Sequence, residues 1–256
     1  MCDLWKTTLT QTVPRGAIPE QIEFALQKLA CRPEQLKLYN GGSFFDPAAI
    51  PPADYGDISR KIGFARHLIV ESHPRLIGRR AVEFRDLLHG SFEVALGLET
   101  IHPEVLPRLN KNFTLAHFAR AASTLRREGI DVRAFVLVKP PFLNEEQGLE
   151  WALKSAAFAF DCGANVVSLI PTRPGNGALE RLMEAGEFSP PRLSTLEKAL
   201  ATALQLARGR VFADTWNLEL FSSCAKCLPA RRKRLETINL TQQMAAPVAC
   251  EACGAL

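Results

Sequence analysis

Six apolar segments alternate with amphipathic segments along the chain, and this alternation constrains the fold more than any other feature. Most apolar segments are continuous, which is typical of parallel strands buried on both faces. A strand and a helix that repeat every 25 to 45 residues or so predict right-handed βα units in a parallel sheet or barrel. The predicted strands are residues 35–39, 67–71, 92–98, 132–138, 165–170 and 210–214. The predicted helices are residues 19–29, 79–88, 103–128, 145–161 and 192–207, with a break near Pro107 and residues 110–112.

Length and composition are those of an ordinary globular protein with one sizeable core. The chain has 256 residues, of which 47% are hydrophobic and 23% charged, and its formal net charge is +4. The βα rhythm ends near Phe221, so we predict a barrel over residues 1–220 and a cysteine-rich appendage over residues 221–256. No apolar run reaches the 18 residues or so of a membrane-spanning helix, and no secretory signal opens the sequence. We therefore expect a cytoplasmic protein without membrane contact, whose thiols stay reduced.

Polar residues follow almost every predicted strand. The carboxyl ends of parallel barrel strands carry the active site, so this pattern favours an enzyme over a scaffold. The glycine pair after the first strand would let backbone groups approach a ligand, although a simple tight turn also explains it. Glu99 has the alternative role of a charge at the start of a helix. The strand-end residues are Asn40, Gly41, Gly42, Ser43, Glu71, Ser72, His73, Glu99, Thr100, Lys139, Thr172, Arg173 and Asp214.

Two Cys-x2-Cys pairs near the C-terminus predict a metal centre. The pairs are Cys224 with Cys227 and Cys250 with Cys253. Each short loop directs two thiolates the same way, and four thiolates suit either a zinc ion or an iron–sulfur cluster. The alternative is four unrelated thiols. Cys31 and Cys162 fall in or beside predicted helices, where packing in the core is expected.

Four consecutive basic residues lie between these pairs, at positions 231–234. Such a run can bind phosphates, or it can form one solvated face of a helix.

Four short phrases, taken in order, resemble the radical SAM (S-adenosylmethionine) superfamily. They are Met-Cys-Asp-Leu-Trp at residues 1–5, Leu-Tyr-Asn-Gly-Gly-Ser-Phe-Phe-Asp at 38–46, Gly-Leu-Glu-Thr at 97–100 and Ile-Pro-Thr-Arg at 170–173. The branch that they resemble includes the archaeosine synthase β-subunit and, more distantly, the Elongator catalytic subunit, and both act on tRNA. The resemblance implies a partial (βα) parallel barrel.

The resemblance also implies that this chain is shortened at its N-terminus. The family holds a [4Fe–4S] cluster with a Cys-x3-Cys-x2-Cys loop directly after its first strand. Cys2 resembles the third cysteine of that loop, which would place the first strand and two cysteines upstream of Met1. We therefore expect this polypeptide to bind the catalytic cluster poorly and to expose one edge of its sheet.

The implied chemistry is reductive cleavage of SAM to methionine and a 5′-deoxyadenosyl radical, which takes hydrogen from the substrate. Lys139 and Arg173 would face that substrate, which the resemblance suggests is tRNA or another nucleoside-containing molecule, with a partner enzyme subunit as a further possibility. Ser43 stands where many family members have an acid. The residues expected to hold the cluster or SAM are Cys2, Asn40, Gly41, Gly42, Ser43, Glu99 and Ile170.

Two other functions stay open from the sequence. One is a non-catalytic α/β scaffold with a zinc-ribbon-like tail that binds RNA, which predicts zinc without iron and no binding of SAM. The other is a metal-free barrel enzyme acting on a phosphorylated small molecule. That enzyme needs a phosphate loop near the last strands, where Gly209 alone is a poor candidate.

Overall fold

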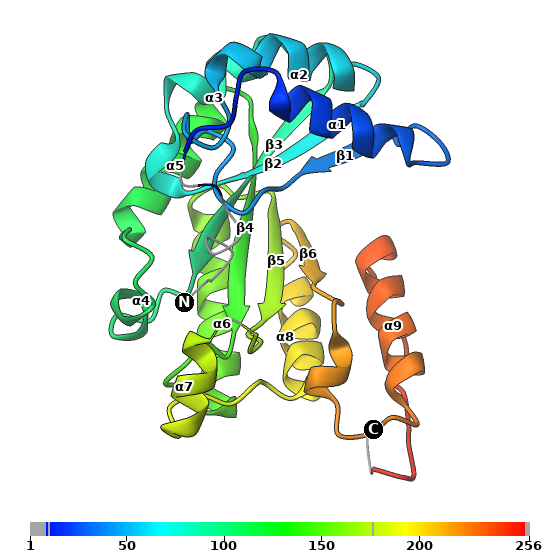
Figure 1. The fold of residues 1–256 in the computed structure, drawn as a ribbon. Helices are drawn as coiled ribbons and strands as arrows, with labels where there is room; N and C mark the ends of the chain where they lie inside the picture. The colour runs from blue at the N-terminus through cyan, green and yellow to red at the C-terminus, as the bar shows by residue number, and fades with distance from the viewer. Residues whose placement is uncertain (1–8, 10, 176, 254–256) are drawn as a thin grey trace. The chain divides into compact units, whose positions relative to one another are not determined.

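Six parallel strands form the framework of the protein, in the spatial order β1-β2-β3-β4-β5-β6. The computed structural model describes residues 9, 11–175 and 177–253 (Figure 1). This α/β arrangement is the predicted partial (βα) barrel, and each strand bound lies within one residue of its prediction. The strands are β1 Gln35–Leu38, β2 His67–Ser72, β3 Ser91–Glu99, β4 Asp131–Val138, β5 Val166–Pro171 and β6 Arg210–Ala213.

The chain divides into two compact units. The first unit comprises the described residues up to Gly97 together with residues 113–133, and the second comprises residues 98–112 and the described residues from Ala134 onward. The second unit contains both sides of the predicted boundary between residues 220 and 221, which remains a prediction.

The first unit places its helices around strands β1 to β3. In the parallel register, His67 of β2 lies opposite Gln35 of β1 and Ser91 of β3. Helix α2 was not predicted; it is short and contains Gly56, which obscures a helical pattern. The helices are α1 Ala17–Gln27, α2 Tyr55–Ile62, α3 Arg79–Arg85 and α5 Leu115–Arg127, and the 3₁₀ turns are η2 Pro52–Asp54 and η3 Pro74–Leu76.

A cluster of aromatic rings anchors the loop that follows β1. Phe44 and Phe45 are fully buried directly after the glycine pair. Phe44 packs on Tyr55 and on Phe84, with ring centroids 5.9 and 4.7 Å away. The Phe45 carbonyl also accepts a hydrogen bond from Arg80 Nη1. These contacts fix the C-terminal end of the Asn40–Gly41–Gly42–Ser43 loop.

The second unit packs α6 against α8, and both helices contact β5 (Figure 1). Helix α6 begins with a reciprocal cap, in which the side chains of Asn144 and Gln147 each accept the other's backbone N–H. Helices α7 and α9 were not predicted as elements. The helices are α4 Val105–Arg108, α6 Glu145–Asp161, α7 Ala178–Glu184, α8 Leu193–Gln205 and α9 Leu228–Thr241, with the 3₁₀ turn η4 Leu218–Phe221.

Gly209 has a different role from the helix cap that its position suggests. The left-handed residue after α8 is Ala207, with φ 51°, and no left-handed φ is found at Gly209. A Cβ at Gly209 would lie 2.6 Å from the Asn165 carbonyl oxygen. The glycine therefore lets the start of β6 come close to the start of β5.

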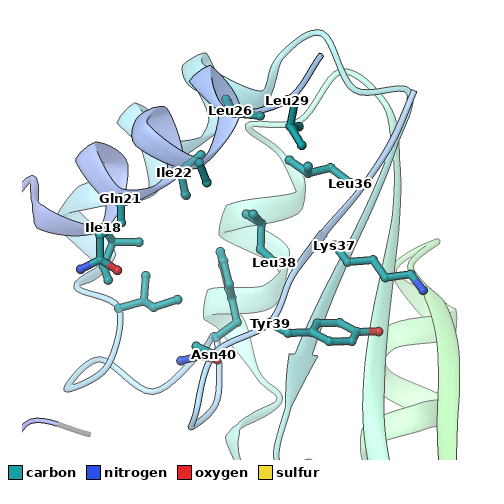
Figure 2. A pocket seen from close by; sticks show the side chains of 13 residues that line it. Ile18, Gln21, Ile22, Leu26, Leu29, Leu36, Lys37, Leu38, Tyr39 and Asn40 are labelled. Atoms are coloured by element: carbon teal, nitrogen blue, oxygen red, sulfur yellow. The ribbon is translucent and has the colours of Figure 1, made fainter. Parts of the chain in front are cut away.

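Strands β1 and β6 end the strand order, and their surroundings differ. Beside β1, α1 leaves an apolar pocket of about 370 Å³, into which Leu36 and Leu38 point (Figure 2). Gln35 and Lys37 on the same strand are exposed, and the expected open edge of the sheet stays a prediction. The edge of β6 is instead covered by side-chain amides of α9, described below.

Within the described residues, no helix combines the length and the apolar character needed to cross a membrane.

Candidate active site and metal centre

The loop after β1 presents an acceptor atom without a partner. The Asn40 N–H donates to Glu71 Oε1 on β2, at 3.2 Å. The Asn40 side-chain oxygen is buried and has no hydrogen-bond partner among the described residues. Neither Gly41 nor Gly42 has a left-handed φ, so the turn itself does not require glycine at either position. A left-handed turn therefore does not account for the glycine pair, and its role in holding a ligand stays a prediction.

Ser43 connects the loops after β1 and β2. Its hydroxyl oxygen accepts the His73 N–H at 2.9 Å. The His73 ring accepts the Arg75 N–H at 3.2 Å and meets the edge of Phe113, with centroids 5.5 Å apart. The position where the family often has an acid is therefore occupied by a hydroxyl that holds a neighbouring loop in place.

Glu99 ends β3 in a conformation that is unusual for its residue type. Its φ is +63° and the residue is 8% exposed. Its carboxylate pairs with Lys111 Nζ at 2.9 Å. A left-handed residue other than glycine costs on the order of 1–3 kcal/mol, and such residues gather at functional sites. Glu99 is thus a buried, ion-paired and strained residue at the end of a strand.

Lys139 directly follows β4 and shares the left-handed backbone conformation of Glu99. Its φ is +53° and it is 3% exposed. The ammonium donates to the Ser189 carbonyl at 2.5 Å and to the Ser189 hydroxyl at 2.7 Å, and lies 3.6 Å from Glu145. Burial lowers the pKa of Lys139, which the Glu145 charge partly opposes. Lys139 lines an open pocket of about 870 Å³ together with Arg108, Phe142 and Glu187.

Arg173, after β5, is held beside aromatic rings. Its Nη2 pairs with Asp214 Oδ2 at 2.7 Å, and its guanidinium carbon lies 5.5 Å from the centroid of Trp216. The Arg173 Nε is buried and has no partner among the described residues. The other Asp214 oxygen accepts the Trp216 N–H at 2.9 Å. Trp216 itself is 68% exposed, which leaves its ring available beside a fixed cation.

The remaining expected SAM residues have less distinct surroundings. Ile170 is half-buried against the apolar cluster of Val105, Leu109, Leu137 and Leu143. Cys2 lies outside the described residues. Within the second unit, Glu99, Lys139 and Arg173 each bind a separate partner, and no direct bond joins any two of the three.

The structure brings the four C-terminal cysteines together. Their sulfur atoms all lie within 4.8 Å of one another. Sulfurs of different pairs are adjacent, with Cys224 Sγ 4.0 Å from Cys250 Sγ and Cys227 Sγ 3.8 Å from Cys253 Sγ. We refer to these four residues as the cysteine cluster. Among the described residues it is the one group of at least three His, Cys, Asp or Glu side chains arranged to hold a metal ion.

The thiols of the cysteine cluster do not ionise alike. A hydrogen bond from the Cys227 backbone lowers the pKa of Cys224 to about 7. Burial, reinforced by hydrogen bonds with the other thiols, raises the pKa of Cys227 to about 12. The free thiols therefore resist joint ionisation, and a cation among them would favour the thiolate forms.

The two described cysteines outside the cluster are less buried than expected. Cys31 is exposed and Cys162 is half-buried, so the prediction that both pack in the core is wrong for Cys31.

The basic run is largely engaged in internal bonds. Arg231 is 8% exposed and binds both oxygens of Glu197 on α8, through Nε at 3.1 Å and Nη2 at 2.5 Å. Arg232 Nη1 donates to the Thr215 carbonyl, and Arg234 Nε to the carbonyl of Ala246. The run is therefore not the solvated helix face that the sequence allowed.

The sequence analysis missed five residues whose side chains bind at these sites or along the edge of β6. Ser189 accepts hydrogen bonds from Lys139, Glu145 forms an ion pair with it, and Trp216 lies beside Arg173, although none of the three belongs to a recognisable motif. The side-chain amides of Asn239 and Gln242 bind the edge of β6. Trp216 could have been found from the sequence, because it is an aromatic residue shortly after a predicted strand. The other four residues bind partners that are distant in sequence, which no local pattern indicates.

The sequence has relatives among named proteins, although no known protein-family model matches it. It is 30% identical to archaeosine synthase subunit beta of Methanosarcina acetivorans over 72% of this chain and 55% of that protein. It is also 30% identical to the protein of the same name from Thermococcus kodakarensis, over 77% of this chain and 64% of that protein. The chain thus spans less than two thirds of the length of either relative.

Solved structures share the fold. Elp3 of Methanocaldococcus infernus matches with a TM-score of 0.63 and 16% identity, over 87% of this chain and 58% of that one. Methylornithine synthase PylB matches at 0.59 with 14% identity, over 83% and 60%. HemN from Escherichia coli, described as a radical SAM enzyme, matches at 0.51 with 13% identity, over 76% and 46%. The chain therefore shares the fold of these three structures, one of which is described as a radical SAM enzyme. In sequence it is similar to the two archaeosine synthase β-subunits.

Proposed function

We propose that this chain is the barrel of a radical SAM enzyme that modifies a nucleoside of tRNA together with a partner subunit. The observation that carries this proposal is the 30% identity to two proteins named archaeosine synthase subunit beta, over 72% and 77% of the chain. Their name identifies them as subunits, which supports a partner.

The first unit offers groups that fit the amino group of SAM. The partnerless Asn40 oxygen is an acceptor that an ammonium can satisfy, and a buried acceptor left unpaired is costly. Gly41 and Gly42 are exposed and leave their backbone accessible. The expectation from the sequence that Glu99 of the second unit also holds SAM stays a prediction. Ser43 contributes by bracing the loop through His73.

The thiolates needed for a [4Fe–4S] cluster would come from cysteine residues such as Cys2. Cys2 would supply one thiolate, and within the described residues the cysteine cluster is the one other group of ligands. The prediction that this polypeptide alone binds the catalytic cluster poorly stays a prediction. When bound, the cluster and SAM supply the radical that takes hydrogen from the substrate.

Residues of the second unit are suited to hold a nucleoside. Asp214 fixes the Arg173 guanidinium, and Trp216 exposes a ring beside it. Aromatic and guanidinium planes are the surfaces on which unstacked RNA bases stack. Lys139 fixes the wall of its pocket through Ser189, because its ammonium already has acceptors.

Binding of SAM and its reductive cleavage test this proposal. The chain would be reconstituted anaerobically with iron and sulfide, alone and with its partner subunit, and SAM binding measured by equilibrium dialysis. We expect binding that Asn40→Leu weakens about tenfold and that Gln27→Leu, an exposed control on α1, leaves unchanged. Formation of 5′-deoxyadenosine that increases with tRNA would support the substrate class.

The scaffold alternative predicts the opposite results. A protein that binds tRNA but neither binds nor cleaves SAM, with or without its partner, would favour the non-catalytic scaffold. If Asn40→Leu bound SAM as well as the parent does, the assignment of the loop after β1 to SAM would be wrong.

A further inference from the structure

The spacing of the cysteine cluster distinguishes between the metals that four thiolates can hold. Around a tetrahedral zinc ion, with Zn–S bonds of about 2.3 Å, sulfurs lie roughly 3.8 Å apart. The cross-pair distances here are 4.0 and 3.8 Å, and no two sulfurs are more than 4.8 Å apart. In an iron–sulfur cluster the thiolates are spread over several irons joined by sulfides, which requires wider spacing. The cysteine cluster therefore has room for a single ion.

The environment also suits a compact anionic centre. Four thiolates around Zn²⁺ carry a net charge of −2. Arg231 and Arg234 line the same recess as Cys253, and Arg231 follows Cys227 by one helical turn. Cys227 is 4% exposed, so one ligand is shielded from solvent. Four protein ligands complete a tetrahedral coordination sphere, as in structural zinc sites.

The position of the cysteine cluster links two separate parts of the C-terminal segment. Cys224 and Cys227 stand directly before α9, whereas Cys250 and Cys253 come after the segment that returns along this helix (Figure 1). Arg234 of α9 donates to the Ala245 and Ala246 carbonyls of that returning segment. An ion bound by all four thiolates would tie the beginning of α9 to the end of the returning segment.

Helix α9 in turn covers the free edge of β6. The Asn239 side chain binds the N–H and carbonyl of Ala213, at 2.9 and 2.8 Å. The Gln242 side chain does the same for Val211, at 2.8 and 3.0 Å. Two side-chain amides thus replace the backbone of a neighbouring strand, and an uncovered edge would be open to pairing with other chains.

We propose that Cys224, Cys227, Cys250 and Cys253 bind one tetrahedral zinc ion, and that this ion holds α9 over the edge of β6. Binding displaces the thiol protons and changes no oxidation state. The proposal is independent of SAM chemistry, because it concerns residues other than those assigned to SAM above.

Metal content of the purified full chain tests the identity of the ion. With zinc and iron both supplied, we expect one zinc per chain, absent from the Cys250→Ser/Cys253→Ser variant. Cys2→Ala removes the cysteine expected to bind iron near the N-terminus, so any iron bound through Cys2 is lost from this variant. Cys31→Ser is the control for an exposed thiol. Iron bound by these four cysteines, as one ion or as a cluster, or no metal at all, would overturn the proposal.

Hydrogen exchange tests the role of the ion in the unsubstituted protein. After the zinc is removed by a chelator, we expect amide exchange at Val211 and Ala213 to rise at least about tenfold, while Val167 and Leu169 in the interior of β5 stay protected. Restored zinc should restore protection. If β6 kept its protection in the zinc-free protein, or β5 lost protection equally, the ion would not act on this edge.

Discussion

Asn239 on α9 binds both backbone groups of Ala213 on β6 with its side-chain amide, accepting the N–H at 2.9 Å and donating to the carbonyl at 2.8 Å. Gln242 repeats this arrangement at Val211. The amide group has the same donor and acceptor as a peptide unit, so the helix satisfies a strand edge without a further strand. Asn239 lies in the last turn of α9, and Gln242 is the left-handed residue that caps the helix, with φ 56°, so both amides come from the C-terminal end of α9.

Asn239→Asp should destabilise the protein by about 1–3 kcal/mol, because a carboxylate cannot donate to the Ala213 carbonyl. The side chain keeps its size, so packing is little changed. Urea unfolding at neutral pH measures the difference. Thr237→Ala, at an exposed position of the same helix, should change stability by less than about 0.5 kcal/mol. Equal stability of Asn239→Asp and the parent would show that the bonds to β6 contribute nothing.

Two glycines in first helical turns should respond to alanine with opposite signs. In α6, a Cβ at Gly148 would lie 2.6 Å from Lys139 Cβ and 2.9 Å from its Cα. Gly148→Ala should therefore destabilise the protein by roughly 1–3 kcal/mol and displace Lys139. In α2, a Cβ at Gly56 meets only the flexible end of Arg60 at 3.8 Å. Gly56→Ala should stabilise by up to about 1 kcal/mol.

Thermal unfolding of the two alanine variants gives the comparison. Stabilisation by both substitutions would mean that β4 shifts away from α6 without cost.

The buried pair of Glu93 and Arg133 should make the stability of the first unit depend on pH. Glu93 is 4% exposed and binds Arg133 Nε at 2.5 Å. Burial alone would raise the pKa of Glu93, but bonds and charges from His67 and Arg133 lower it overall. A lowered folded pKa contributes stability above the unfolded pKa of about 4.3 and loses it as pH falls through the folded value. The parent should therefore lose stability in acid.

Glu93→Gln should lose less folding stability than the parent as the pH falls, because glutamine does not titrate. Urea unfolding of both proteins at pH 7 and in acid measures this difference. Arg133→Leu leaves the carboxylate buried without its partner and should cost about 3–5 kcal/mol at neutral pH. Glu93→Leu/Arg133→Leu should recover most of that loss. If the free energy of unfolding of Glu93→Gln fell with pH as steeply as that of the parent, other carboxylates would be responsible for the loss of stability in acid.

Arg231→Lys should weaken the fold and leave RNA binding unchanged. The guanidinium binds both Glu197 oxygens, and an ammonium cannot reproduce that geometry. We expect a loss of about 1–3 kcal/mol in thermal unfolding. Lys233→Ala, at the exposed position of the basic run, should leave stability within about 0.5 kcal/mol. Reduced RNA affinity of a fully stable Arg231→Lys protein would instead indicate that this arginine contacts phosphate.

The sequence predicts the strands and the cysteine cluster well, for physical reasons that are local. Buried strands are continuous apolar runs, so β4 and β5 are recognisable without tertiary information. A Cys-x2-Cys spacing fixes the geometry within each pair, and only the meeting of the two pairs needs the fold. Helices α2 and α7 are too short for a clear periodic pattern, and α7 follows a segment rich in glycine.

Other features depend on contacts that no local pattern encodes. The partner of Arg231 is Glu197, 34 positions earlier, so a basic run that suggests a solvated face is instead part of the packing. The left-handed conformations of Glu99 and Lys139 are equally hidden, because the usual signal for that conformation is glycine or asparagine. The strand ends are predictable as places for function, whereas their backbone geometry is not.

The left-handed backbone at Glu99 and Lys139 has a consequence for how these positions tolerate variation. Where φ is positive, glycine and asparagine relieve the conformation. In a library randomised at either codon and selected only for folding, these two residues should therefore displace glutamate and lysine. Selection for activity should reverse that enrichment wherever the charged group is needed. The difference between the two selections separates, codon by codon, the demands of the backbone from those of the chemistry.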